Sequence, residues 1–136
     1  MNLKYDPQAA LNKMPALARQ HYLKAKEYSY SKQHENTIKE CNESIKIKPT
    51  AEAYCEMAVS YMEKKDFNAA IGYLKESIKI NPKYPKPQYA IAVCYISINP
   101  ADTKSARMHY EKAKKLKYQI PEWFIRRLKK LEGASK

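Results

Sequence analysis

An internal repeat of about 33 residues is the feature that most limits how this chain can fold. The segment Glu43–Thr50 reads ESIKIKPT, and it returns 33 residues later as ESIKINPK at Glu76–Lys83. Small residues and tyrosines recur in register with this repeat, at Ala25 and Tyr28, Ala58 and Tyr61, and Ala92 and Tyr95. A period of this length indicates a supersecondary unit that stacks on copies of itself.

Each copy is predicted to be a pair of helices. In the central copy, the spacing i, i+3, i+4, i+7 places four residues on one face of a helix, namely Tyr54, Met57, Ala58 and Tyr61. The same spacing returns after the short turn Lys65-Asp66, in Ala70, Tyr73, Leu74, Ser77 and Ile78. Ala58 and Ala70 stand where the two helices must come close. Pro82 ends the second helix, because proline has no backbone N–H to donate.

These positions resemble the tetratricopeptide repeat family. The family places a large residue, then Leu-Gly, then Tyr in the first helix, followed by Ala, Phe and Pro. The central copy matches with Tyr54, Met57, Ala58, Tyr61, Ala70, Leu74 and Pro82. The outer copies match less fully, with Tyr118 at the proline position of the third. The resemblance implies an all-α fold, a right-handed superhelical α-solenoid of helix–turn–helix repeats.

We expect one domain over residues 1–136. It would have a lead helix at about 7–13, repeats at about 16–50, 51–83 and 84–118, and a capping helix at about 121–131. The third turn holds about two extra residues, and Asn99-Pro100 is expected to restart the chain for the helix that follows. The last helix is amphipathic, with Phe124 and Leu128 on one face and basic residues on the other. It is interpreted as a cap over the last repeat, or alternatively as a docking helix for a membrane or an acidic partner.

No pattern in the sequence indicates catalysis or metal binding. The three histidines are scattered, and two glycines cannot build a phosphate-binding loop. The chain has an odd number of cysteines, three, and none of them shows CxxC spacing: Cys41, Cys55 and Cys94. This argues against a disulfide framework or a zinc site. We therefore expect no enzyme activity, no cofactor and no metal, and small buried thiols in a reducing cytoplasm. Neither a membrane span nor a signal peptide is predicted.

The resemblance implies that the first helix of each repeat lines a concave groove. Residue by residue, this gives Arg19, Tyr22, Lys26, Glu52, Cys55, Glu56, Val59, Met62, Lys86, Tyr89, Val93 and Ile96 as partner-binding positions. Four of them form an apolar strip, namely Val59, Met62, Val93 and Ile96. Such a strip with a polar rim predicts the docking of a peptide or a helix. The open alternative is that the lead helix or a second chain fills the groove.

One subclass of the family can be tested against the sequence. Repeats that clamp the acidic C-terminal tails of heat-shock chaperones use Lys, Asn, Asn, Lys and Arg in the groove. The matching positions here are Tyr22, Lys26, Glu56, Lys86 and Ala90, and only Lys86 agrees. Because Glu56 would repel a carboxylate, chaperone-tail binding is rejected.

The sequence favours a non-enzymatic protein–protein interaction module that binds a peptide segment or helix. Two alternatives are kept. The formal charge is +12, of which +7 lies in residues 101–136, so a basic C-terminal surface could bind nucleic acid or another anionic partner. The two glutamates of the central copy make nucleic acid the weaker choice for the groove. The other alternative is a chaperone-like or self-assembling scaffold that forms a homo-oligomer.

Overall fold

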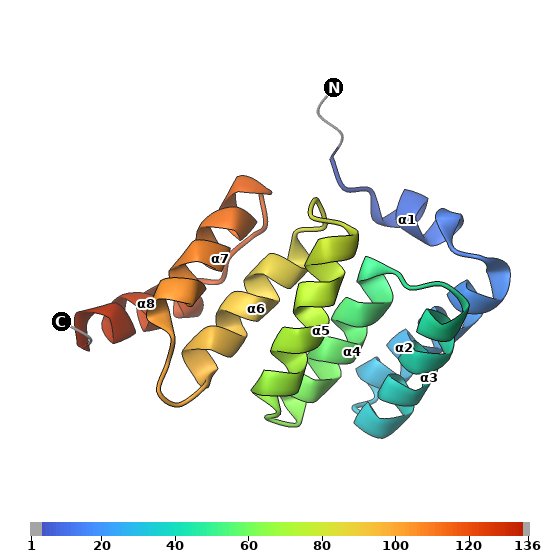
Figure 1. Ribbon diagram of the computed structural model, residues 1–136, viewed down its shortest axis with the longest axis horizontal. Coiled ribbons are helices and arrows are strands. Elements are labelled where there is room, and N and C mark those ends of the chain that lie inside the picture. The colour runs from blue at the N-terminus through green and yellow to red at the C-terminus, as the bar shows by residue number, and fades with distance from the viewer. Residues whose placement is uncertain (1–3, 135–136) are drawn as a thin grey trace.

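The computed structural model describes residues 4–134, and in that range the chain consists of helices without any strand (Figure 1). The all-α prediction is therefore confirmed. In order the helices are α1 (Pro7–Lys13), α2 (Ala16–Tyr30), α3 (His34–Ile47), α4 (Ala51–Glu63), α5 (Phe67–Ile80), α6 (Lys86–Ser97), α7 (Thr103–Lys115) and α8 (Glu122–Ala134).

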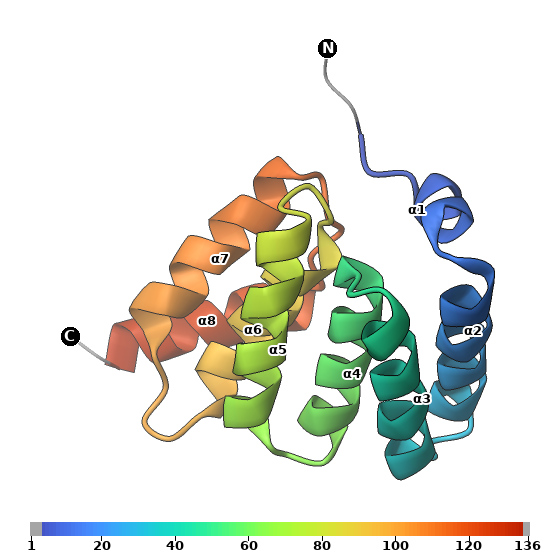
Figure 2. The ribbon, with the colours of Figure 1, turned by 45° about the vertical axis from the view of Figure 1, so that its right-hand side comes forward.

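The helices stack as successive antiparallel pairs. Helices α2 and α3 form the first pair, α4 and α5 the second, and α6 and α7 the third, and each pair contacts the next. Figures 1 and 2 show the pairs following one another along the molecule, with α1 near one end and α8 at the other. The first helices also contact each other in series, α2 with α4 and α4 with α6. The fold is thus a helical repeat solenoid, and we call the surface formed by α2, α4 and α6 the first-helix face.

The three pairs are equivalent in their side-chain contacts. One position of each first helix meets one position of each second helix in every repeat. In the first repeat His21 Nδ1 lies 2.6 Å from Glu40 Oε2. The Tyr54 and Tyr73 rings stack with centroids 6.3 Å apart in the second, and His109 Nδ1 lies 2.7 Å from Gln88 Oε1 in the third. The repeat geometry is therefore kept while the chemistry of the contact changes.

A residue in the left-handed conformation makes the connection between paired helices short in the first two repeats. Lys32 and Lys65 each follow the helix end with φ values of 61° and 66°. This left-handed conformation closes a helix with a backbone bond from the next residue, as from Asp66 N to Tyr61 O at 2.9 Å. Asp66 then caps α5 by accepting a hydrogen bond from the Ala69 N–H.

The third turn is longer than the first two, as the sequence predicts. The helix after Asn99-Pro100 begins only at Thr103, because Asp102 is its N-cap and accepts hydrogen bonds from the N–H and hydroxyl of Ser105. The extra residues of this turn therefore lie before the cap as irregular chain. A capping carboxylate is a stronger start signal than proline, which only tolerates the first helical turn.

The core runs between the helix layers and is built on small residues. Ala58 and Ala70 are fully buried in one cluster with Leu74 and Ile91, so α4 and α5 approach closely. Buried hydroxyls join neighbouring helices as well, since Ser77 Oγ donates to the Ala51 carbonyl at 2.6 Å and Ser44 Oγ donates equivalently to the Ala18 carbonyl at 2.8 Å.

Candidate partner-binding site

The middle of the first-helix face keeps part of the predicted apolar strip accessible. Val59 of α4 is half-buried, and it is not a member of the hydrophobic clusters found in residues 4–134. Met62, one turn further on, is also half-buried and packs against the cluster around Ala58. Val59 is therefore the clearest apolar side chain on this face that the fold itself does not use.

The N-terminal end of the face is covered by the chain itself. Tyr5, just before α1, stacks on Tyr84 with ring centroids 4.5 Å apart and an interplanar angle of 28°. Its hydroxyl donates a hydrogen bond to Glu52 Oε2 at 2.7 Å. Met14, at the other end of α1, is buried with Tyr22 and Ala53. At this end of the face, the lead segment therefore fills the groove, which is one of the alternatives that the sequence left open.

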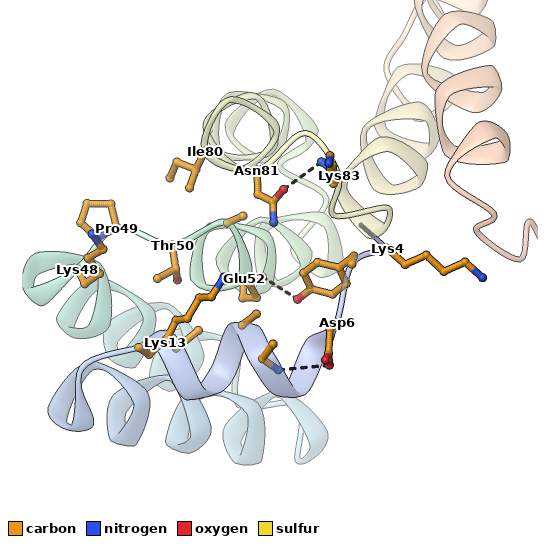
Figure 3. A pocket seen from close by; sticks show the side chains of 15 residues that line it. Lys4, Asp6, Lys13, Lys48, Pro49, Thr50, Glu52, Ile80, Asn81 and Lys83 are labelled. Atoms are coloured by element: carbon orange, nitrogen blue, oxygen red, sulfur yellow. Dashed lines mark hydrogen bonds between the residues drawn. The ribbon is translucent and has the colours of Figure 1, made fainter. Parts of the chain in front are cut away.

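Two hollows flank that covering segment. The larger, of about 600 Å³, lies between α1 and the loops that precede α4 and α6 (Figure 3). Figure 3 shows Lys13 of α1 reaching toward the wall that carries Thr50 and Glu52, with Pro49 and Ile80 further along the rim. The smaller, of about 270 Å³, is lined by Tyr22, Lys26 and Glu52 from the predicted site, together with Leu11 and Tyr84.

Five of the predicted site residues are less than a tenth exposed, which corrects their expected role as an open lining. They are Tyr22, Glu52, Cys55, Glu56 and Ile96. The first four lie toward the end covered by Tyr5 and α1, and Ile96 packs against α8. The sequence assigns their side chains to the correct helices, but not the segments that cover them.

The electrostatics of the covered end are set by two buried carboxylates. Glu52 accepts the Tyr5 hydroxyl, and Glu56 Oε2 lies 3.9 Å from Lys26 Nζ. Burial raises the pKa of Tyr5, and the hydrogen bond to Glu52 raises it further. The pKa of Tyr22 is raised by burial and then by Glu56 and Glu52. Both tyrosines therefore stay protonated at neutral pH, and the Tyr5 hydroxyl donates its hydrogen bond to a carboxylate.

The C-terminal end of the face is occupied by α8. Phe124 and Leu128 are buried against Ala92 and Ile96, and Tyr89 and Val93 pack against the same cluster. The Phe124 ring meets Tyr89 edge to face at 5.5 Å. Arg107 of α7 holds the far end of α8 through Glu132, with Nη2 to Oε1 at 2.6 Å. Tyr89, Val93 and Ile96 are thus largely contacts for α8, as a capping helix requires.

The remaining predicted residues, Arg19, Lys26 and Lys86, are half-buried on the first-helix face. Sequence reasoning missed Tyr5 and Tyr84, which lie outside the matched repeat positions. The only sequence signal near them is the helix start at Asp6-Pro7, which places a chain segment before the first repeat without saying what it touches.

Metal and thiol chemistry find no support in residues 4–134. No group of three or more His, Cys, Asp or Glu side chains in that range could hold a metal ion. Cys41, Cys55 and Cys94 are free and buried. Burial raises the pKa of Cys94 to about 12, and that of Cys55 to about 12 despite an opposing effect of Lys86. Such thiols are poor nucleophiles at neutral pH.

Comparison with known families decides the class of the repeat. The family model of the tetratricopeptide repeat matches residues 51–84. Residues 51–84 therefore form a tetratricopeptide repeat. No curated protein matches it significantly. The matched segment covers α4, α5 and the loop that leads to α6, so the central copy carries the most typical repeat sequence.

Solved tetratricopeptide repeat domains share its fold. The first such domain of Spaghetti (RPAP3), bound to the HSP90 peptide SRMEEVD, is 16% identical with a TM-score of 0.77, and the match covers 98% of each chain. The domain of Sgt2 from Aspergillus fumigatus is 16% identical, with a TM-score of 0.76 over 88% of this chain and 80% of that one. The yeast Sti1 TPR2B domain in complex with pHsp70 is 23% identical, with a TM-score of 0.71 over 75% and 81%.

Among the residues that the structure describes, no helix combines the length and apolar character needed to cross a membrane.

Proposed function

We propose that this protein is a non-enzymatic interaction module that binds an extended segment or a helix of another protein on its first-helix face. The observation that carries the proposal is Val59, an apolar side chain that stays half-buried on the middle helix of the face and belongs to none of the hydrophobic clusters of residues 4–134. Apolar positions with a polar surround are what peptide-binding faces offer. Two tetratricopeptide repeat domains of Spaghetti, which share this fold, bind an HSP90 peptide, and that of Sti1 forms a complex with pHsp70.

The proposal treats residues 1–136 as one domain in the cytoplasm, with no catalytic residue and no cofactor. Three buried free cysteines support a reducing compartment. The partner is not proposed to be an acidic chaperone tail, because Glu52 and Glu56 stand on this face and Lys26 is already paired with Glu56. A bound carboxylate would meet the negative charges of Glu52 and Glu56 at this end of the face.

A single charge placed on the face tests the proposal. Val59→Glu should abolish capture of partners from extracts of the source cells while leaving the melting temperature nearly unchanged. Lys79→Glu on α5 is the matched control, since Lys79 is exposed on a second helix, and it should retain capture. Equal capture by the two variants would refute the proposal. Unfolding of the Val59 variant would show instead that Val59 belongs to the core.

A second candidate ligand is anionic and would bind at the corner of α7 and α8. A hollow of about 320 Å³ there is lined by Lys114 and Lys117 with Tyr110 and Tyr118, and no acidic side chain lines it. Lysines with stacking aromatics are what single-stranded nucleic acid binds. Filter binding of random oligonucleotides over a salt series tests this, because phosphate contacts weaken steeply as salt rises. Lack of retention at low salt would remove this candidate.

A further inference from the structure

Tyr5 makes the contact that ties the N-terminal segment to the first-helix face. Its ring lies on Tyr84 and its hydroxyl reaches Glu52, which is 47 residues away along the chain. Glu52 is only 8% exposed. A buried carboxylate needs a donor, and a tyrosine hydroxyl meets that need while its ring excludes water from the bond. The contact therefore resembles specific recognition of a ligand group, and not the loose packing of a segment that merely lies on the surface.

The segment that carries Tyr5 is held lightly. None of the side chains of α1 is buried, and apart from Tyr5 the segment is anchored by Leu11, which is partly buried, and by Met14, just past the helix. Helix α1 is absent from the helix pairs of residues 4–134 that have extensive contacts. Few buried apolar contacts mean a low free energy of local opening.

The two hollows beside the segment indicate what its release would open. The hollow of about 600 Å³ and the hollow of about 270 Å³ share Tyr5, Met14 and Glu52 in their walls. Tyr5 thus stands between them, and its departure would join them into one cleft along the start of α4. The segment leaves part of this end of the face unfilled, which is expected of a ligand that can be displaced.

We propose that residues 4–14 act as an intramolecular ligand of the first-helix face, and that the partner displaces them by presenting a tyrosine of its own to Glu52 and Tyr84. This inference rests on the proposed function. The pocket selects a ring with a hydroxyl donor, because Tyr84 offers a stacking surface and Glu52 an acceptor. An acidic side chain is excluded by Glu52 and Glu56, and an aliphatic one leaves Glu52 without its donor.

A labelled peptide with the sequence of residues 4–14 is the probe, and a second peptide replaces its tyrosine with alanine. Fluorescence anisotropy measures both peptides against the full chain, against the double variant Tyr5→Ala/Leu11→Ala, and against Tyr30→Ala. The last is a matched control, because Tyr30 is 78% exposed and lies on α2. Circular dichroism verifies that each variant keeps its helices.

The double variant should bind the tyrosine peptide about tenfold more tightly than the wild type does, because the tethered segment competes at millimolar effective concentration. The Tyr30 variant should behave as wild type. The alanine peptide should bind the double variant about tenfold more weakly than the tyrosine peptide, since it lacks a hydrogen bond to a buried charge.

Equal binding by the wild type and the double variant, equal binding of the two peptides, or no binding to the double variant would each overturn the inference. The proposed function is judged separately by partner capture with Val59→Glu. Loss of capture in that variant, with no effect of Tyr5→Ala/Leu11→Ala on the peptide, would leave the proposed function standing and remove the intramolecular ligand.

Discussion

Mild acid should destabilise this protein through one buried histidine, His109. It lies on α7, is 9% exposed, and stacks on Tyr95 with ring centroids 5.7 Å apart. Its Nδ1–H donates to Gln88 Oε1, a contact that a neutral imidazole satisfies. Burial above all, and then the nearby charges of Lys112 and Lys75, lower the pKa of His109 to about 4.

The sign and size of the effect follow from that pKa. In the unfolded chain a histidine has a pKa near 6.5 and takes up a proton as the pH falls below that value, whereas folded His109 stays neutral until about pH 4. Between these values the unfolded state binds more protons, so the free energy of unfolding decreases as the pH falls. The loss amounts to about 2 kcal/mol between pH 7 and pH 5.

Urea unfolding followed by circular dichroism at pH 7, 6 and 5 measures this loss, and His109→Gln isolates it from other groups. The glutamine amide can still donate to Gln88 but does not titrate. The wild type should therefore lose about 2 kcal/mol more than the variant over this range. Parallel pH dependence of the two proteins would refute the assignment of His109 as a buried neutral group.

Three further predictions concern the packing of the repeats. Ala58→Arg or Ala70→Arg should destabilise the fold by more than about 3 kcal/mol in urea titrations, because both sites are fully buried, whereas Ala16→Arg at an exposed site should be tolerated. Ser77→Ala should cost about 1 kcal/mol, since it removes the buried bond to the Ala51 carbonyl. Ser97→Ala, whose exposed hydroxyl bonds within α6, should cost far less, and equal losses would contradict the role of Ser77 in joining α5 to α4. Ellman's reagent should modify the buried Cys41, Cys55 and Cys94 only as fast as the chain unfolds, so rapid reaction under native conditions would contradict their burial.

The fold was open to prediction because the repeat contacts recur at a fixed spacing in the sequence. The positions that Ala58, Ala70 and Leu74 hold in the central copy recur in the other two copies, so the helix pattern and the period point to the same architecture. The start of α7 is less evident from the sequence, because Asn99-Pro100 indicates where the chain restarts, whereas the helix begins after its N-cap Asp102.

The candidate site was only partly open to prediction. The repeat pattern gives the helix and the side of the helix on which Val59 or Glu52 stands. It does not reveal Tyr5, because a contact across 47 residues from outside the repeats leaves no periodic signal. Nor does it reveal that α8 uses Tyr89 and Val93, since an amphipathic capping helix can dock in more than one place.

Photo-crosslinking tests the use of the first-helix face most directly. Benzoylphenylalanine would replace Val59 in one protein and Lys79, exposed on α5, in another, and each would be irradiated in an extract of the source cells. We expect a discrete higher-mass adduct from position 59 and none from position 79. An adduct from position 79 alone, or no adduct from position 59, would contradict the claim that this face receives a partner.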